Sequence, residues 1–186
     1  SVSVMPCTAK KHELGRNDQG QDGYQDVDFS ITTRELAKMI RLAGIEFMKL
    51  EDEPYDNPLG EYTGAGVIFG ATGGVMEAAL RTAVEKLTGD ELINLDFVDV
   101  RGVKGVKEAE YDLQGQKVKV AVASGLANAR VILDNVKAGE ADYTFIEIMG
   151  CPGGCVNGGG QPHVDSQIRN FMDVRAERAK GLYTLD

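Results

Sequence analysis

The chain has 186 residues, of which 29 are acidic and 20 basic, so its formal net charge at pH 7 is −9. This acidity argues against nucleic acid or anionic lipid as a partner, because both bind clustered Lys and Arg. The sequence contains no apolar run of about eighteen residues, so we expect no membrane span. Its length suits one domain or two small lobes with a proper core.

The first elements follow from polarity and capping signals. Residues 1–5, SVSVM, alternate and are rich in β-branched side chains, which predicts a strand. The polar, glycine-rich stretch 11–30 predicts a loop. Thr32 and Glu35 have the spacing of a capping box and predict the start of a helix, which would end near Gly44.

The middle of the chain predicts a loop, a turn and a helix. Residues 51–66 hold two prolines, three glycines and many acids, which indicates a long surface loop. The GATGG sequence at 70–74 lacks the G-x-G-x-x-G spacing of dinucleotide-binding turns, so we expect a structural turn. Residues 75–87 predict an amphipathic helix ended by Gly89. Its expected shared face comprises Val75, Ala78, Ala79, Thr82, Ala83 and Leu87.

The rest of the chain alternates strands and helices. The predicted strands are 95–101, 105–113, 117–123 and 143–149, and the predicted helices are 124–139 and 165–182, with a tight hairpin turn at Gln114–Gln116. The strand–helix–strand order over 117–149 is that of a βαβ unit. We therefore expect an α/β fold in which helices flank a parallel or mixed sheet.

Three cysteines carry the most specific chemical signal. Cys7 lies near the start of the chain, and Cys151 and Cys155 open the stretch CPGGCVNGGGQP. An odd number of cysteines does not fit a disulfide framework, and a chain of this size needs none. Plain buried thiols remain possible, as do thiolate ligands to zinc, Cu(I) or an iron–sulfur cluster.

The two cysteine sites share one layout. Met5 precedes Cys7 by two residues at the end of a predicted strand, and Met149 precedes Cys151 in the same way. Ligands of α/β proteins bind at the carboxyl ends of strands, so we expect the two sites to meet. Glycines at 153–154 and 158–160 would let the backbone approach a cluster closely, with its N–H groups as donors, and adopt positive φ. Lys10 would add positive charge nearby.

Two longer stretches resemble signature motifs of the FeFe (iron-only) hydrogenases. MPCTAKKHE at 5–13 has the form M-P-C-x-x-K-x-x-E, and EIMGCPGGCVNGGGQP at 147–162 has the form E-x-M-x-C-x-x-G-C-x-x-G-G-G-Q-P. The stretches at 32–40 and 65–81 are also similar to that family's catalytic domain. The resemblance covers nearly the whole chain, so 1–186 is expected to be the C-terminal part of that two-lobed domain.

The resemblance implies an H-cluster, in which a 4Fe–4S cubane is joined to a di-iron centre that carries CO, cyanide and a bridging dithiolate. It implies interconversion of H2 with two protons and two electrons. The implied cubane ligands are Cys7, Cys151 and Cys155, the last of which bridges to the di-iron centre. The residues implied around the di-iron centre are Met5, Pro6, Lys10, Glu13, Phe69 and Met149, with Lys10 donating to cyanide and Glu13 near that lysine.

The sequence departs from the family at its start. The motif T-S-C-C-P-x-W is missing, and with it the fourth cubane cysteine and a proton-relay cysteine, so we expect a fragment that is inactive without an upstream half. The family further implies a ferredoxin-type electron carrier, maturation proteins and a cytoplasmic location, with a periplasmic parent as the other option.

The alternative function is that of a non-catalytic relative that handles iron–sulfur clusters or senses redox state. The retention of Met5, Lys10 and Met149 argues against this alternative.

Overall fold

The computed structural model describes every residue except 58–59, 61–62, 90–96, 103 and 114. The chain divides into two compact units. Unit 1 comprises Ser1–Glu61 and Gly158–Met172, and unit 2 comprises Tyr62–Asn157 and Asp173–Asp186. The second signature motif is therefore split between them, with its cysteines in unit 2 and its triple glycine in unit 1.

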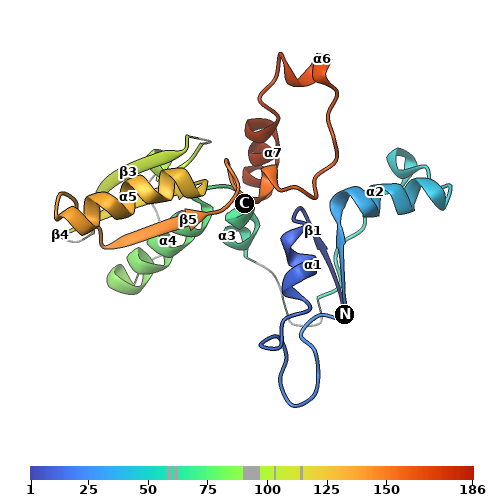
Figure 1. The fold of residues 1–186 in the computed structure, drawn as a ribbon, viewed down its shortest axis with the longest axis horizontal. Helices are drawn as coiled ribbons and strands as arrows, with labels where there is room; N and C mark the ends of the chain where they lie inside the picture. The colour runs from blue at the N-terminus through green and yellow to red at the C-terminus, as the bar shows by residue number, and fades with distance from the viewer. Residues whose placement is uncertain (58–59, 61–62, 90–96, 103, 114) are drawn as a thin grey trace. The chain divides into compact units, whose positions relative to one another are not determined.

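Unit 1 is built on a two-stranded parallel sheet. Strand β1 (Val2–Met5) pairs with β2 (Phe29–Thr32), with Val2 opposite Phe29 and Met5 opposite Thr32. Helix α1 (Ala9–Glu13) follows the turn after β1, and α2 (Thr33–Leu42) follows β2 directly (Figure 1). The unit also contains the 3-10 helix η1 (Phe47–Lys49) and the short helix α6 (Ser166–Arg169).

Helix α2 begins at the predicted capping box. The side-chain oxygen of Thr32 accepts from the Glu35 amide at 3.1 Å, and the Glu35 carboxylate accepts from the Thr32 amide at 2.8 Å. These two bonds satisfy amide groups that have no partner within the helix. The strand predicted at 1–5 is confirmed as β1, whereas the loop predicted at 11–30 is only partly correct. That stretch contains the end of α1 and the start of β2, whose partners come from β1.

Unit 2 contains a three-stranded mixed sheet in the order β3–β4–β5. Strands β3 (Val106–Leu113) and β4 (Gln116–Ser124) are antiparallel, and β4 pairs in parallel with β5 (Phe145–Met149) through helix α5 (Leu126–Ala138). The predicted βαβ unit and the α/β fold class are thus confirmed. The hairpin turn predicted at 114–116 includes a residue outside the described part of the chain.

The alternation of β4 divides the core of unit 2 into two layers. Val120 and Val122 face a cluster that includes Met76, Leu80 and Val84 of helix α4 (Gly74–Thr88). Ala121 and Ala123, on the other face of the strand, pack with Ala129 and Ile132 of α5. The sheet therefore lies between α4 and α5, and the carboxyl ends of β4 and β5 stay open for the loops that follow them.

Two predicted features of unit 2 need correction. The predicted face of α4 is only partly correct: Ala78 is buried and Ala83 packs against the core, but Leu87 is 48 % exposed. The large core side chains of the helix are instead Met76, Leu80 and Val84. An i, i+4 series of large apolar side chains buries more area than the alanines do. The strand predicted at 95–101 is wrong over its described part, where Val98–Val100 forms the 3-10 helix η3.

The helix predicted at 165–182 is two helices. Asp165 caps α6 by accepting from the Gln167 amide at 2.8 Å, and Asp173 caps α7 (Val174–Tyr183) by accepting from the Arg175 amide at 3.0 Å. An aspartate that binds backbone amides in this way starts a new helix, which explains the break. The loop predicted at 51–66 likewise ends early, because Gly64–Val67 forms the short helix α3.

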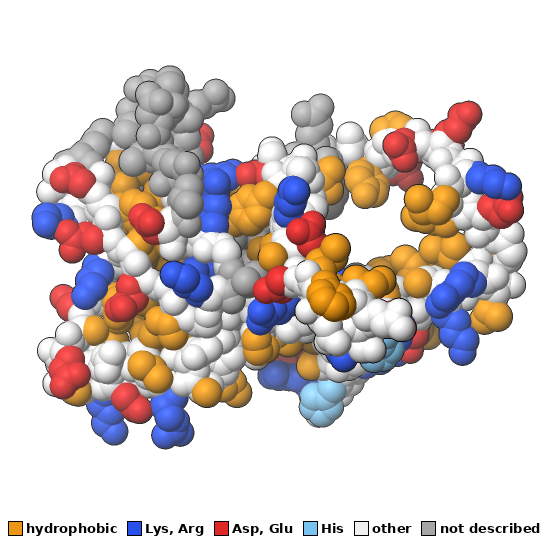
Figure 2. Space-filling model, turned by 90° about the horizontal axis from the view of Figure 1, so that it is seen from above, with side chains coloured by type: hydrophobic (Ala, Val, Ile, Leu, Met, Phe, Trp, Pro, Cys, Tyr) orange, Lys and Arg blue, Asp and Glu red, His pale blue; other side chains and the backbone are white. Residues whose placement is uncertain are grey.

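The surface carries charged side chains of both signs, as the count of acidic and basic residues leads one to expect (Figure 2). Figure 2 shows acidic and basic side chains interspersed on the face that it draws. None of the described helices is both long and apolar enough to cross a membrane.

Candidate metal centre

In unit 1, the turn after β1 carries the partly buried Cys7 between Pro6 and α1. The amide of Gly160 donates to the carbonyl of Pro6 at 3.0 Å. A Cβ atom built on Gly160 would lie 2.8 Å from the Cys7 nitrogen, closer than real Cβ contacts allow. The predicted close approach of the triple glycine is therefore made at Gly160, and against the cysteine turn itself.

The start of α2 holds the triple glycine in place. The Arg34 amide donates to the carbonyl of Gly160 at 3.0 Å, and its guanidinium donates to the carbonyls of Gly159 at 2.6 Å and Gln161 at 3.0 Å. The Thr33 hydroxyl donates to the Gly160 carbonyl at 3.0 Å. Sequence reasoning missed Arg34; its position in the first turn after a capping box was the only available signal.

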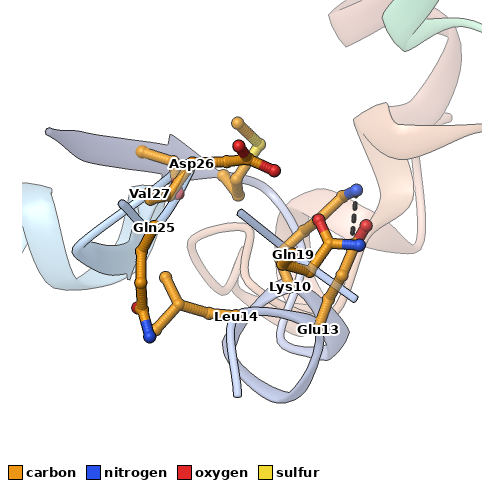
Figure 3. A pocket seen from close by; sticks show the side chains of 9 residues that line it. Lys10, Glu13, Leu14, Gln19, Gln25, Asp26 and Val27 are labelled. Carbon is orange, nitrogen blue, oxygen red and sulfur yellow. Dashed lines mark ion pairs between the residues drawn. The ribbon is translucent and has the colours of Figure 1, made fainter. Parts of the chain in front are cut away.

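Lys10 and Glu13 form an ion pair beside Met5. Their Nζ and Oε2 atoms are 2.6 Å apart, and both side chains are about half exposed, at 48 % and 38 %. Figure 3 shows the two charged groups side by side, with Gln19 next to them. They line a cavity of about 170 Å³, whose other lining residues are Ser3, Met5, Leu14, Gln19, Gln25, Asp26 and Val27.

In unit 2, the loop after β5 carries the other two cysteines. Cys151 is partly buried and Cys155 is exposed, and neither forms a disulfide. Between them Gly153 and Gly154 have φ angles of +87° and +96°, a conformation that favours glycine. The Gly154 amide donates to the Cys151 carbonyl at 2.9 Å. The positive φ predicted for these two glycines is confirmed, whereas the described glycines at 158–160 do not have it.

This cysteine loop is anchored from two sides. The Gly153 amide donates to the Ser124 hydroxyl at 3.1 Å, and the Gly153 carbonyl accepts from the Thr72 amide at 3.1 Å. A Cβ atom on Gly154 would lie 2.6 Å from the Thr72 nitrogen. The loop therefore packs directly on the turn formed by residues 71–74, which confirms that GATGG is a structural turn at the start of a helix.

Two buried charged residues hold that turn. The Glu147 carboxylate accepts from the amides of Gly73 at 2.6 Å and Met76 at 2.7 Å. The Lys107 ammonium donates to the carbonyls of Thr72 at 2.7 Å and Gly102 at 2.9 Å. Burial lowers the pKa of Lys107 to about 8, although the charge of Glu147 acts in the opposite direction. The sequence analysis assigned Lys107 no role and included Glu147 only as the first residue of the second signature motif.

The remaining predicted residues flank the same loop. Met149 ends β5 two residues before Cys151, and its carbonyl accepts from the Gly125 amide at 2.8 Å. Phe69 lies in the 3-10 helix η2 (Ile68–Gly70), just before the turn, and is 47 % exposed. Both side chains thus belong to unit 2, together with Cys151 and Cys155.

A separate ionic cluster surrounds Glu77, which lies in the first turn of α4. The carboxylate of Glu77 is fully buried and accepts from Arg81 and Arg101, each at 2.6 Å, and from Tyr183 at 3.2 Å. Burial alone would raise the pKa of Glu77, but the hydrogen bonds from Arg101 and Arg81 outweigh it and hold the pKa below its ordinary value. Asp186 pairs with Arg81 at 2.6 Å.

Comparison with known proteins identifies the family. The C-terminal domain of the iron-only hydrogenase large subunit matches residues 1–159. The chain belongs to this family. The resemblance to FeFe hydrogenases that the sequence motifs indicated is thereby confirmed.

Individual relatives show how far the likeness extends. Iron hydrogenase 1 of Clostridium pasteurianum is 50 % identical over 186 residues, which is 100 % of this chain and 32 % of that protein. The solved structure of the FeFe hydrogenase HydA1 from Chlamydomonas reinhardtii has 37 % identity and a TM-score of 0.73, and the match covers 97 % of this chain and 52 % of that one. The mouse protein named cytosolic iron-sulfur assembly component 3 is 33 % identical over 166 residues, or 86 % of this chain and 35 % of that protein.

The chain spans about a third of the length of the curated relatives that it matches. The rest of each relative lies outside the matched region.

The side chains present fit an iron–sulfur centre of this hydrogenase family. Cys7, Cys151 and Cys155 lie in the segments that follow strands β1 and β5, and none of the three forms a disulfide. Soft thiolates are the ligands that such clusters take. Among the described residues, no three His, Cys, Asp or Glu side chains come together as a metal-ion site. Each unit instead offers its own part, and convergence of the three thiols stays a prediction.

Proposed function

We propose that this chain is part of the catalytic domain of an FeFe hydrogenase, and that the complete protein interconverts H2 with two protons and two electrons at an H-cluster. The observation that carries the proposal is the repeated arrangement of a methionine ending a strand and a cysteine two residues later. It occurs at Met5 and Cys7 and again at Met149 and Cys151, with Lys10 on the helix after the first turn.

Cys7, Cys151 and Cys155 would hold three irons of the 4Fe–4S cubane, and Cys155 would bridge to the di-iron centre. When bound, this cofactor supplies electron exchange through the cubane and hydrogen chemistry at the CO- and cyanide-bearing di-iron centre. The protein's own task is to bind, orient and shield it. Cys155 suits the bridging role because it is exposed while Gly153 and Gly154 behind it are buried.

Lys10 would donate a charge-assisted hydrogen bond to an anionic ligand of the di-iron centre. Its ammonium pairs with Glu13, which keeps the charge near the turn that carries Cys7. Met5, Pro6, Met149 and Phe69 would shield the di-iron centre from water. Met5 already lines the same cavity as Lys10 and Glu13.

The second candidate function is iron–sulfur cluster assembly or redox sensing without hydrogen chemistry. The similarity to the mouse assembly component favours it. The residues that would distinguish the two functions are those around the di-iron centre rather than the cysteines. Retention of Met5, Lys10 and Met149 supports the hydrogenase.

The proposal includes partners that complete the site. The upstream part of the catalytic domain would supply the fourth cubane cysteine and the proton relay, a ferredoxin-type carrier would exchange electrons, and maturation proteins would deliver the di-iron centre. We expect the 186-residue chain to be inactive by itself and to gain activity with the upstream part. A cytoplasmic location is proposed, with a periplasmic parent as the other option.

The first experiment is anaerobic reconstitution with iron and sulfide, followed by iron counting and EPR. About four irons per chain are expected, as a cubane requires, and Cys7→Ala should lose them. Equal iron in wild type and Cys7→Ala would contradict convergence of the thiols. Hydrogen evolution by the complete, matured protein then separates the two functions, because an assembly protein would hold the cubane and release no H2.

A further inference from the structure

The contacts that hold the cysteine loop of unit 2 begin at two buried charges. Lys107 and Glu147 are each 6 % exposed. We propose that Lys107 and Glu147 are positioning residues that fix the Cys151–Cys155 loop in its cluster-binding conformation before the cluster binds. The inference rests on the proposed function, since it takes these cysteines as cluster ligands.

The first step runs through the two backbone groups of Thr72. Its carbonyl accepts from the Lys107 ammonium at 2.7 Å, and its amide donates to the Gly153 carbonyl at 3.1 Å. Lys107 therefore fixes the orientation of the residue that receives the cysteine loop. Gly153 in turn donates to the Ser124 hydroxyl, so the loop has a fixed contact on each side.

The second step fixes the turn at the start of α4. The first amides of a helix have no partner within it, and the Glu147 carboxylate satisfies two of them, those of Gly73 and Met76. Gly73 has a φ of +94°, and a Cβ atom on it would lie 1.8 Å from the Val100 carbonyl oxygen. The turn is thus tightly confined, and the carboxylate is the acceptor that its amides face.

These contacts close a ring that includes Cys151. Glu147 lies on β5, four residues before Cys151 on the same chain. From Glu147 the ring passes through the amide of Gly73 to Thr72, then to Gly153, and back through the loop to β5. The strand that leads to Cys151 therefore also holds the turn on which the cysteine loop rests, so the position of Cys151 depends on Glu147.

The two charges also depend on each other. Lys107 binds the Thr72 carbonyl and Glu147 binds the Gly73 amide, so the two side chains hold the two sides of one peptide group. The negative carboxylate also favours the charged form of the buried lysine. Removal of one partner would leave the other charge buried without compensation, whereas removal of both avoids that penalty. A structural core pair would destabilise unit 2 as a whole, but a positioning pair must act on the loop more than on the rest of the unit.

Amide hydrogen exchange of the metal-free protein tests the proposal. Wild type is compared with Glu147→Gln, Lys107→Met and the double variant Glu147→Gln/Lys107→Met, and exchange is followed at residues 149–158 relative to 126–138 in α5. The matched control is Glu77→Gln, since Glu77 is likewise buried and its carboxylate binds Arg81 and Arg101 instead of the amides of the turn. Alkylation of Cys151 is measured relative to Cys7 in unit 1.

The loop amides should exchange about tenfold faster, relative to α5, in Glu147→Gln and Lys107→Met, because a buried hydrogen bond to a charged group is lost. Cys151 should alkylate faster while Cys7 does not. If a single variant fails to fold, the double variant carries the test, since it leaves no uncompensated charge but still leaves the Thr72 carbonyl without its donor.

Unchanged exchange in the loop, or equal acceleration by Glu77→Gln, would overturn the proposal. Its failure is distinguishable from failure of the proposed function, because exchange is measured without iron and iron binding is measured separately. Faster loop exchange with no iron in wild type would keep the positioning role and reject the cluster. If wild type binds iron that Cys151→Ala loses, but loop exchange is the same in wild type and in the Lys107 and Glu147 variants, the cluster is kept and the positioning role is rejected.

Discussion

The amide of Gly160 donates to the carbonyl of Pro6 across 154 residues of sequence, at 3.0 Å. This bond joins the triple glycine of one signature motif to the cysteine turn of the other within unit 1. The turn that carries Cys7 therefore depends on backbone that lies directly after Cys155 and the 3-10 helix η4 (Cys155–Asn157) in sequence. Substitutions in the glycines should reveal this dependence.

Gly160→Ala is expected to displace Cys7. Its Cβ atom would lie 2.8 Å from the Cys7 nitrogen and 2.9 Å from the Pro6 carbonyl carbon, and backbone cannot yield cheaply. Overpacking of this kind costs about 1–3 kcal/mol. Thermal unfolding should report the lost stability, and iron counting after reconstitution should report lost cluster. Gly159→Ala is the control, because its Cβ atom would lie 3.4 Å from its nearest neighbour, the Thr8 hydroxyl oxygen. An equal loss of iron in Gly159→Ala would contradict the prediction.

Gly154→Ala is expected to disturb the loop of unit 2. Its φ of +96° strains any other residue, and a Cβ atom would lie 2.6 Å from the Thr72 nitrogen. A non-glycine residue in such a conformation costs about 1–3 kcal/mol, before the clash is added. Reconstituted protein should therefore hold less iron. In the same loop, Gly150→Ala meets nothing within 4 Å and should retain the iron of wild type.

The sequence predicted the unit 2 sheet well because its signals are local. The stretch 117–149 alternates strand-forming and helical patterns, and Gly139 ends α5 in the left-handed conformation typical of a helix end. The capping box of α2 is likewise a signal within four residues. Elements whose sequence encodes both their period and their ends were therefore found with correct type and near-correct bounds.

The missed features depend on distant partners. Strand β2 has only four residues, and it forms by pairing with β1, which is distant in sequence. Its local composition therefore did not predict a strand. Lys107 and Glu147 occupy strand positions where charged residues normally face water, and only the turn at 71–74 explains their burial. Sequence motifs named the cysteines, Lys10 and the methionines, but the residues that hold their loops in place became visible only in the structure.

Lys10→Met should affect activity far more than stability. The Lys10–Glu13 pair is about half exposed, and such surface ion pairs contribute about 0–1 kcal/mol. If Lys10 donates to an anionic ligand of the di-iron centre, loss of that charge-assisted bond should lower hydrogen evolution by at least about tenfold. Activity of the complete, matured protein and its thermal midpoint are the two measurements.

Lys11→Met is the matched control for this variant. Lys11 neighbours Lys10 on α1 and forms an ion pair of the same length, 2.6 Å, with Glu35, at similar exposure. Its loss should change stability by a comparably small amount and leave hydrogen evolution near that of wild type. Equal loss of activity in both variants would show that general charge, rather than the position of Lys10, matters.

Acidification should weaken unit 2 through the Arg81 cluster. Hydrogen bonds from Arg81 hold the pKa of Asp186 below its ordinary value, and those from Arg101 and Arg81 do the same for the buried Glu77. The unfolded chain therefore binds more protons than the folded one at acid pH. The stabilisation is fully present above the ordinary carboxyl pKa, near 4, and is lost as pH falls through the folded values.

Arg81→Gln should consequently lower stability by about 2 kcal/mol at neutral pH, because it removes charged hydrogen bonds to two carboxylates. The difference in thermal midpoint between wild type and variant should be largest near pH 7 and should shrink below about pH 4. Lys117→Gln serves as the control, since its pair with Glu110 is 75 % and 51 % exposed and should contribute little at any pH. A wild-type advantage that stays constant from pH 7 to pH 3 would show that Arg81 acts through packing rather than through these carboxylates.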